Sequence, residues 1–192
     1  MAADSVKFIN YLHINENIGG YYIDPFELIT NPHDRFIFKN LLKILFIPGN
    51  DIYILCSQLS NDNNSNDLKT VYDSIQVYGD MVEITDPHKT AVQLAARIQF
   101  HHEYSAKILS ILWENYHQLS FFKPNVDLNW ETFHSYGSNL FLPDADGKKM
   151  FSFDFMNFLV MKGQGGESLN INHKKTYALP DIKDIFHGKF KS

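Results

Sequence analysis

The sequence predicts a mainly α fold of the α+β class: a helical bundle around one long central helix, with a small β-hairpin or strand element in the C-terminal third. Three observations predict this fold. From Asp86 to Phe122 an Asp-Pro start suits a helix N-cap, and no further proline or glycine follows. Apolar residues in this stretch recur on one helical stripe. Beyond Gly137, phenylalanines alternate with polar residues, which is typical of a β-hairpin.

The central helix is predicted over about 87–121. At 100° per residue one apolar stripe forms, and its members are Leu94, Ile98, Leu109, Leu112, Tyr116 and Leu119. A helix with such a stripe needs neighbours to cover it. The chain has 192 residues, so we expect one domain, 1–192, in which the other helices pack on that side.

Shorter helices are expected near the N-terminus. Val6–Ile14 fits either a short helix or a strand. Asp24-Pro25-Phe26-Glu27 resembles a capping box at the start of a short helix. Residues 34–47 are apolar nearly all round, which predicts a buried helix. Its polar exception is a basic ladder at four-residue spacing, expected to face solvent: Arg35, Lys39 and Lys43.

Two more helices are expected before the central one. Apolar residues in 51–59 recur at helical spacing and favour a helix, with a strand as the alternative because Ile-Tyr-Ile-Leu also suits a sheet. The polar run 61–67 predicts an exposed loop. Helical spacing then returns up to Asp86 at Leu68, Val71, Tyr72, Ile75, Tyr78 and Val82.

Pro124 predicts a break after the central helix. Asn129 is expected to cap a short helix over 130–136. Segments 139–142 and 150–155 flank a turn and predict a hairpin. Segment 151–161 fits either a strand or a helix, and 169–179 is expected to form a further strand.

Composition narrows the possible functions. The formal net charge of −5 argues against direct nucleic-acid binding, which relies on clustered cations. The single cysteine, Cys56, excludes an intrachain disulfide and a cysteine-rich zinc site, and its apolar context indicates a core residue. No apolar run approaches the ~20 residues that span a bilayer. The start, MAADSVKFIN, lacks signal-peptide features, so a cytoplasmic protein without membrane contact is expected.

One segment is a candidate for catalysis: Arg97-Ile-Gln-Phe-His101-His102. Its Arg-x4-His spacing resembles the signature of HEPN-family ribonucleases, which are all-helical. That resemblance implies that Arg97 steadies phosphate charge and His102 is a general acid or base, with His101 beside it and no metal. The family usually has a polar residue after the arginine, whereas this chain has Ile98. The alternative is structural, because His101 falls within the apolar stripe as an interior histidine.

Metal sites are not predicted. Two Glu-x-x-His units, Glu114–His117 and Glu131–His134, invite comparison with di-iron carboxylate bundles. They are only 17 residues apart with Pro124 between them, and the bundle needs them on well-separated helices with two further glutamates. Asp-rich loops near 62 and 144 lack the glycine and glutamate of an EF-hand. We therefore expect neither a metal nor a cofactor.

These patterns favour binding over catalysis. The chain is similar in general type to immunity proteins that neutralise nuclease toxins, being small, acidic and without catalytic motifs. That similarity implies a module that binds another protein, an inhibitor that occludes a basic enzyme; the HEPN-like ribonuclease is the alternative. Carboxylates would steer the partner and Trp113, off the main stripe, would anchor it. The predicted carboxylates are Asp62, Asp67, Asp73, Asp80 and Glu83.

Overall fold

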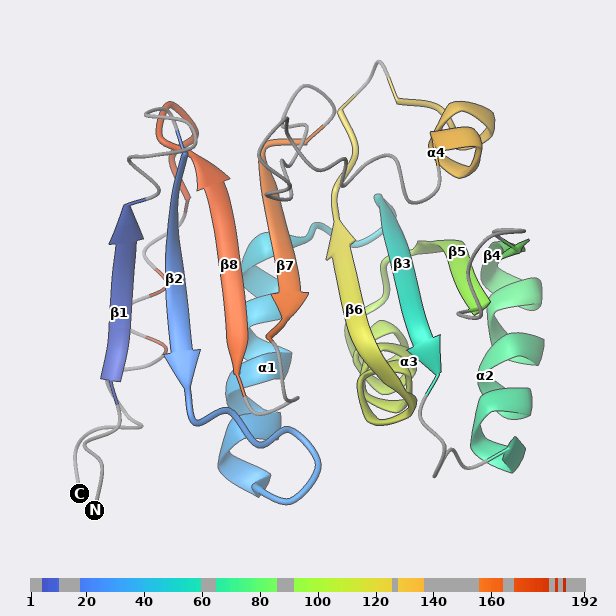
Figure 1. The fold of residues 1–192 in the computed structure, drawn as a ribbon, viewed down its shortest axis with the longest axis horizontal. Helices are drawn as coiled ribbons and strands as arrows, with labels where there is room; N and C mark the ends of the chain where they lie inside the picture. Colours follow the sequence, from blue (N-terminus) through green and yellow to red (C-terminus); the bar gives the residue numbers. More distant parts are fainter. Residues whose placement is uncertain are drawn as a thin grey trace.

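The protein is built on one antiparallel β-sheet that carries three of the described helices on one face (Figure 1). The computed structural model describes residues 5–10, 18–59, 65–85, 92–125, 128–136, 156–163, 168–179, 182 and 185. The described strands number eight, in the order β1-β2-β8-β7-β6-β3-β5-β4. They are β1 (Ser5–Asn10), β2 (Ile18–Asp24), β3 (Asp51–Leu59), β4 (Gly79–Thr85), β5 (Val92–Gln99), β6 (Tyr116–Phe122), β7 (Phe158–Lys162) and β8 (Leu169–Lys174). The helices are α1 (Pro32–Leu45), α2 (Ser65–Tyr78), α3 (His102–Asn115) and α4 (Trp130–Tyr136).

The predicted helical bundle around a long helix over 87–121 is wrong. Within that segment, β5 and β6 flank α3, so only its middle is helical. Leu94, Ala96 and Ile98 alternate along β5 and are fully buried. This two-residue period fits a strand, although the same stretch also fits a helical stripe. Pairing with β3 on one edge and β4 on the other decides for the strand, because it satisfies the backbone of β5 on both sides.

The expected helix is interrupted at two points, and neither of them carries proline or glycine. The N–H of Phe100 donates to the carbonyl of Asn50 at 2.7 Å, which ties this residue to the turn before β3. Helix α3 begins only at His102. At the other end Tyr116 has an extended backbone, φ −116° and ψ 136°, and β6 starts there directly. Tertiary pairing therefore overrides the local helical pattern.

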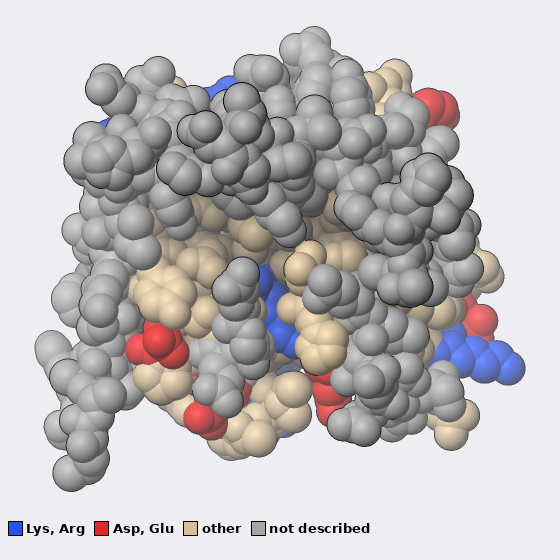
Figure 2. All heavy atoms as spheres, in the orientation of Figure 1, with Lys and Arg blue, Asp and Glu red and all other residues tan. Residues whose placement is uncertain are grey.

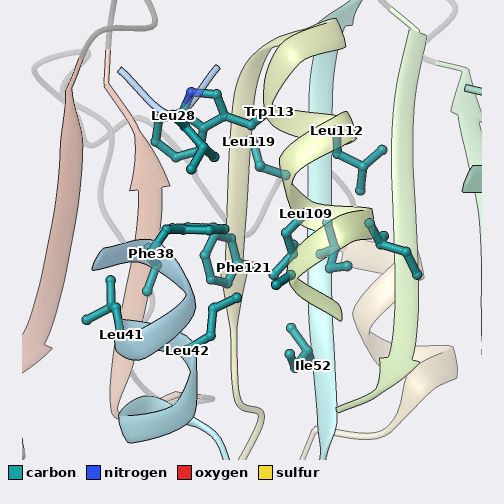
Figure 3. Close-up of a cluster of buried hydrophobic side chains, with 14 of the residues drawn as sticks. Leu28, Phe38, Leu41, Leu42, Ile52, Leu109, Leu112, Trp113, Leu119 and Phe121 are labelled. Carbon is teal, nitrogen blue, oxygen red and sulfur yellow. The ribbon is translucent and has the colours of Figure 1, made fainter. Parts of the chain in front are cut away.

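Helices α1, α3 and α2 cover one face of the sheet, with α3 in contact with both of the others (Figure 1). Phe38 of α1 and Phe121 of β6 have ring centroids 6.1 Å apart, and Trp113 of α3 lies 6.0 Å from Phe38. Figure 3 shows these side chains meeting between helices and sheet. This layer holds the larger of the two buried clusters and is the main core. Each fully buried large apolar side chain in it contributes about 1.5–3 kcal/mol to the stability of the fold.

Three further predictions need correction. Residues 51–59 form β3, so the helix favoured there is wrong and the strand alternative is right. The helix expected up to Asp86 stops at Tyr78, and β4 starts at Gly79. A Cβ at Gly79 would lie 1.8 Å from the carbonyl oxygen of Arg97, so glycine allows β4 to pair closely with β5. Asp24 ends β2 and caps no helix; Asn31 is instead the N-cap of α1.

Other predictions are confirmed. Helix α1 forms as predicted and its basic ladder is exposed: Arg35, Lys39 and Lys43. The expected burial on all other sides is wrong, because Phe36 and Ile44 are also exposed. Asn129 caps α4, since its Oδ1 accepts a hydrogen bond of 2.8 Å from the Thr132 N–H. Residues 158–162 take the strand alternative, and 169–174 form the expected last strand. The predicted hairpin over 139–155 lies outside the described residues.

A second, smaller core lies on the sheet face opposite the three helices. Helix α4 covers it, and its members include Tyr53, Phe122, Leu128, Phe133 and Leu159. Tyr53 and Phe133 have ring centroids 4.7 Å apart. The sheet is thus buried on both faces near β3, which explains why β3 is apolar at successive positions. In the described part of the chain, every helix is too short or too polar to cross a membrane.

Candidate protein-binding surface

The side of helix α2 that faces solvent carries both polar and apolar residues. At 100° per residue, Asp73 and Val77 fall opposite the buried side of the helix. Val77 is 72% exposed and Asp73 is also exposed. The buried side packs on β4, β5 and α3 and consists of Leu68, Val71 and Ile75. Val77 and Asp73 lie on the solvent-facing side of α2, so neither holds this helix to the sheet.

A shallow hollow of about 360 Å³ lies beside these two residues. It is lined by Thr70, Asp73, Ser74 and Val77 of α2 and by Tyr104 of α3. Tyr104 is half-buried in the first turn of α3. The hollow therefore combines a carboxylate, three hydroxyl-bearing residues and apolar surface. We call these five residues the α2 surface.

The acidic residues predicted to meet a partner are distributed over α2 and β4. Asp73 lies on the α2 surface. Asp67 is half-buried in the first turn of α2, where a carboxylate also stabilises the helix dipole. Asp80 and Glu83 belong to β4, and of Glu83 only the backbone is described. Asp62 lies outside the described residues.

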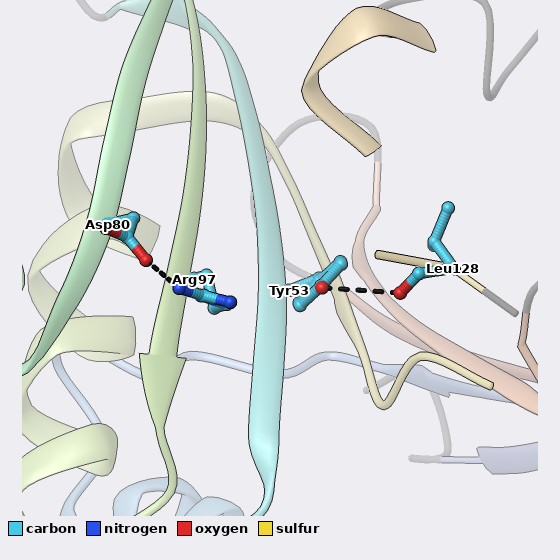
Figure 4. Close-up of polar contacts among 4 residues, drawn as sticks. All are labelled: Tyr53, Asp80, Arg97 and Leu128. Atoms are coloured by element: carbon cyan, nitrogen blue, oxygen red, sulfur yellow. Dashed lines mark hydrogen bonds and ion pairs between the residues drawn. The ribbon is translucent and has the colours of Figure 1, made fainter. Parts of the chain in front are cut away.

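Arg97 occupies a polar cluster on the opposite face of the sheet (Figure 4). The register pairs Asp80 with Arg97 and Arg97 with Tyr53, so the three residues form one row across β4, β5 and β3. Arg97 donates to the Asp80 carboxylate in an ion pair. Its guanidinium also lies 5.6 Å from the ring centroid of Trp130 in α4. The arginine thus holds two strands and α4 together.

Charges in this cluster are already satisfied. Burial opposes the charge of Arg97, but the hydrogen bond and ion pair with Asp80 outweigh it, so the pKa of Arg97 is raised. Tyr53 donates its hydroxyl to the carbonyl of Leu128 at 3.3 Å, and burial raises the pKa of Tyr53. Both groups keep their protons at neutral pH. The cluster therefore acts as a structural contact between the sheet and α4.

The structure does not bring Arg97 together with His101 and His102. Arg97 faces α4, whereas His102 starts α3 on the other side of the sheet, and its ring packs edge-on against Phe100 at 5.1 Å. His101 is the exposed N-cap of α3, so its expected place inside an apolar stripe is wrong. The Arg-x4-His spacing spans a strand end and a helix start, which separates the groups. The geometry gives the ribonuclease alternative no support.

Trp113, the predicted aromatic anchor, is 1% exposed and belongs to the core. Beside it lies Lys162, a residue that the sequence patterns did not single out. Its Nζ donates to the carbonyls of Trp113 and Tyr116, the latter at 2.8 Å, and lies 5.7 Å from the Trp113 ring. Burial lowers the pKa of Lys162. The sequence did contain a signal for its burial. Side chains alternate between the two faces of a strand, so Lys162 falls on the same face of β7 as the core residues Phe158 and Val160.

Figure 2 shows the face opposite the three helices, on which a few acidic and basic side chains of described residues are visible. The described residues include no group of three His, Cys, Asp or Glu side chains placed to hold a metal ion. No protein-family model matches this chain, and comparison with curated proteins and with solved structures finds no match either. Its function must therefore be inferred from its own residues.

Proposed function

We propose that this protein is a protein-binding module whose α2 surface binds a basic partner, in the manner of an inhibitor that occludes an enzyme. One observation carries the proposal: Val77, 72% exposed, adjoins Asp73 at the rim of a hollow. An apolar side chain that solvent surrounds gains free energy when a partner buries it. A cytoplasmic location is part of the proposal, supported by the lone buried thiol of Cys56.

The two kinds of residue would act at different stages of binding. The net charge of −5 and the carboxylate of Asp73 would attract a basic partner and raise the association rate. Val77 and Tyr104 would then lose solvent exposure in the complex, and burying an exposed valine contributes up to about 1.5 kcal/mol. Occlusion needs no catalytic group, which suits a chain whose candidate catalytic residues lie apart.

Affinity capture with matched variants tests this function. The tagged protein is incubated with a lysate of the cells that make it, and retained proteins are identified by mass spectrometry. The test variant is Asp73→Lys with Val77→Asp, which raises the net charge by one. The control, Glu131→Gln, makes the same change in net charge on exposed α4. We expect one basic protein to be retained by wild type and control and lost with the test variant.

The captured partner then permits a test of inhibition. If it is an enzyme, its activity should fall as wild-type protein is added, and the α2 variant should not lower it. Binding should weaken as salt is raised, because steering by surface charge is screened. Retention of the same proteins by wild type and by the α2 variant would refute the assignment of function to this surface.

A further inference from the structure

Helix α1 exposes a row of basic side chains next to a row of apolar ones. The basic residues follow one another at four-residue spacing from Arg35 to Lys43, so they lie along one line of the helix surface. Two apolar residues, Phe36 and Ile44, lie on the adjoining line, and a third follows just after the C-terminus of the helix. We call these exposed residues the α1 surface: Arg35, Phe36, Lys39, Lys43, Ile44 and Ile47.

The apolar side chains of the α1 surface lie outside the core. In the described part of the chain five large apolar side chains are exposed, and three of them belong to this surface. A fourth, Ile29, lies in the turn before α1. Phe36 and Ile47 are each 63% exposed. Apolar surface in water is unfavourable, so its concentration around one helix indicates a contact that lies outside the fold itself.

The α1 surface is positively charged, although the chain as a whole carries a net charge of −5. From Phe36 to Asn50 the sequence contains two lysines and no acidic residue. None of the three cations of the α1 surface forms an ion pair with another described residue. Like charges four residues apart repel each other and weaken a helix, so the stability of the fold does not account for this row.

Neighbouring carboxylates offset this charge only in part. The exposed acids that precede α1, Asp24 and Glu27, accept hydrogen bonds from the hydroxyls of Tyr22 and Thr30. Helix α3, which contacts α1, adds one net negative charge through three exposed residues: Glu103, Lys107 and Glu114. The α1 surface therefore stays positive and is complementary to an anionic ligand.

We infer that the α1 surface binds a lipid bilayer with anionic headgroups. Phe36, Ile44 and Ile47 enter the boundary between headgroups and acyl chains, and the lysines extend their stems alongside them to reach the lipid phosphates. These apolar residues project into solvent from α1, whereas the hollow described above lies on α2 and α3. A fluid bilayer takes up projecting side chains without a matching depression, which a folded protein partner would have to provide.

This inference goes beyond the proposed partner site, because none of its residues belongs to the α2 surface. It requires no membrane-spanning helix, since an exposed helix face with apolar and basic residues binds at the interface. Carboxylates elsewhere on the chain weaken the attraction little, because salt screens charges that are more than about 8 Å apart.

Cosedimentation with lipid vesicles tests the inference. Wild type should bind vesicles of phosphatidylcholine that contain about one-third phosphatidylserine, and should bind pure phosphatidylcholine about tenfold more weakly or less. One cation at an anionic surface strengthens binding about fivefold, so Lys39→Gln with Lys43→Gln should weaken it about twentyfold. The control, Lys69→Gln with Lys123→Gln, removes the same charge from α2 and from the residue after β6 and should bind like wild type.

Two variants of Phe36 test its insertion into the bilayer. The fluorescence of Phe36→Trp should shift to shorter wavelength when the phosphatidylserine vesicles are added, and Phe36→Ala should weaken binding about tenfold. Circular dichroism of every variant shows that it is folded, as expected for changes at exposed positions.

Three results would overturn the inference. Wild type that does not sediment with phosphatidylserine vesicles is one, and equal weakening in the lysine variant and its control is another. The third is binding of Phe36→Trp without a change in its emission. A protein that wild type captures and the lysine variant loses, while wild type binds no vesicles, would assign the α1 surface to an acidic protein and would likewise overturn it.

Discussion

Lys162 joins the C-terminal end of α3 to β7, and replacing it with methionine should measurably destabilise the fold. Methionine keeps a similar unbranched stem beside Trp113 but removes the ammonium group. The variant loses hydrogen bonds to the carbonyls of Trp113 and Tyr116 and the contact of the charge with the Trp113 ring. Because these are the carbonyls at the end of a helix, they lose a favourable positive charge as well.

The magnitude follows from opposing contributions. Hydrogen bonds from a charged group are worth about 1.5–3 kcal/mol each, and a partly buried cation–π contact about 0.5–2 kcal/mol. Removing a half-buried ammonium recovers part of this, because burial disfavours its charge. We expect a net loss of about 2 kcal/mol in the free energy of unfolding. For a chain of this length that corresponds to a fall of about 4–8 °C in Tm.

The pH dependence gives a sharper test. Burial lowers the pKa of Lys162 in the folded protein below the ordinary value of a lysine. Between the two pKa values the unfolded chain binds more protons, so the contribution of Lys162 to stability rises with pH. The difference in urea-unfolding free energy between wild type and Lys162→Met should therefore grow toward alkaline pH. Lys107→Met, on the exposed side of α3, is the matched control and should change stability by less than about 0.5 kcal/mol. A difference that shrinks as pH rises would refute this account, because it would mean that the carbonyls stabilise the charge more than burial opposes it.

Two further outcomes are expected elsewhere in the fold. Burial raises the pKa of the Cys56 thiol, so a thiol reagent should not label it in native protein but should label it rapidly in urea; fast native labelling would contradict its place in the core. Asn129→Ala removes the hydrogen bond from the Thr132 N–H to Oδ1 and should lower the free energy of unfolding in urea by about 1 kcal/mol. Asn129→Asp keeps an acceptor oxygen and should retain most of this stability. An equal loss in the two variants would argue against capping.

The candidate site was predictable only in part. Asp73 was expected to meet a partner from its place on a predicted acidic helix, and the structure puts it at the rim of the hollow. Val77 fell outside the apolar stripe of that helix, and an apolar residue off the stripe is a signal for exposure that could have been used. Trp113 gave the same signal, yet it is buried because α1 and the turn before it supply a second neighbour. The position of a residue on a helix does not reveal how many elements surround that helix.

The sequence by itself determined the local features of this protein: the amphipathic helix α1 with its basic ladder, the cap at Asn129, and the core position of Cys56. These depend on neighbours within a few residues. Only the tertiary structure decided the fate of 87–121. Its apolar residues fit both a 100° and a 180° repeat, and no breaker separates β5 from α3 or α3 from β6. The choice was made by hydrogen bonds to β3, about 40 residues earlier in the chain, because a strand in a sheet is stabilised by partners that its own sequence does not contain.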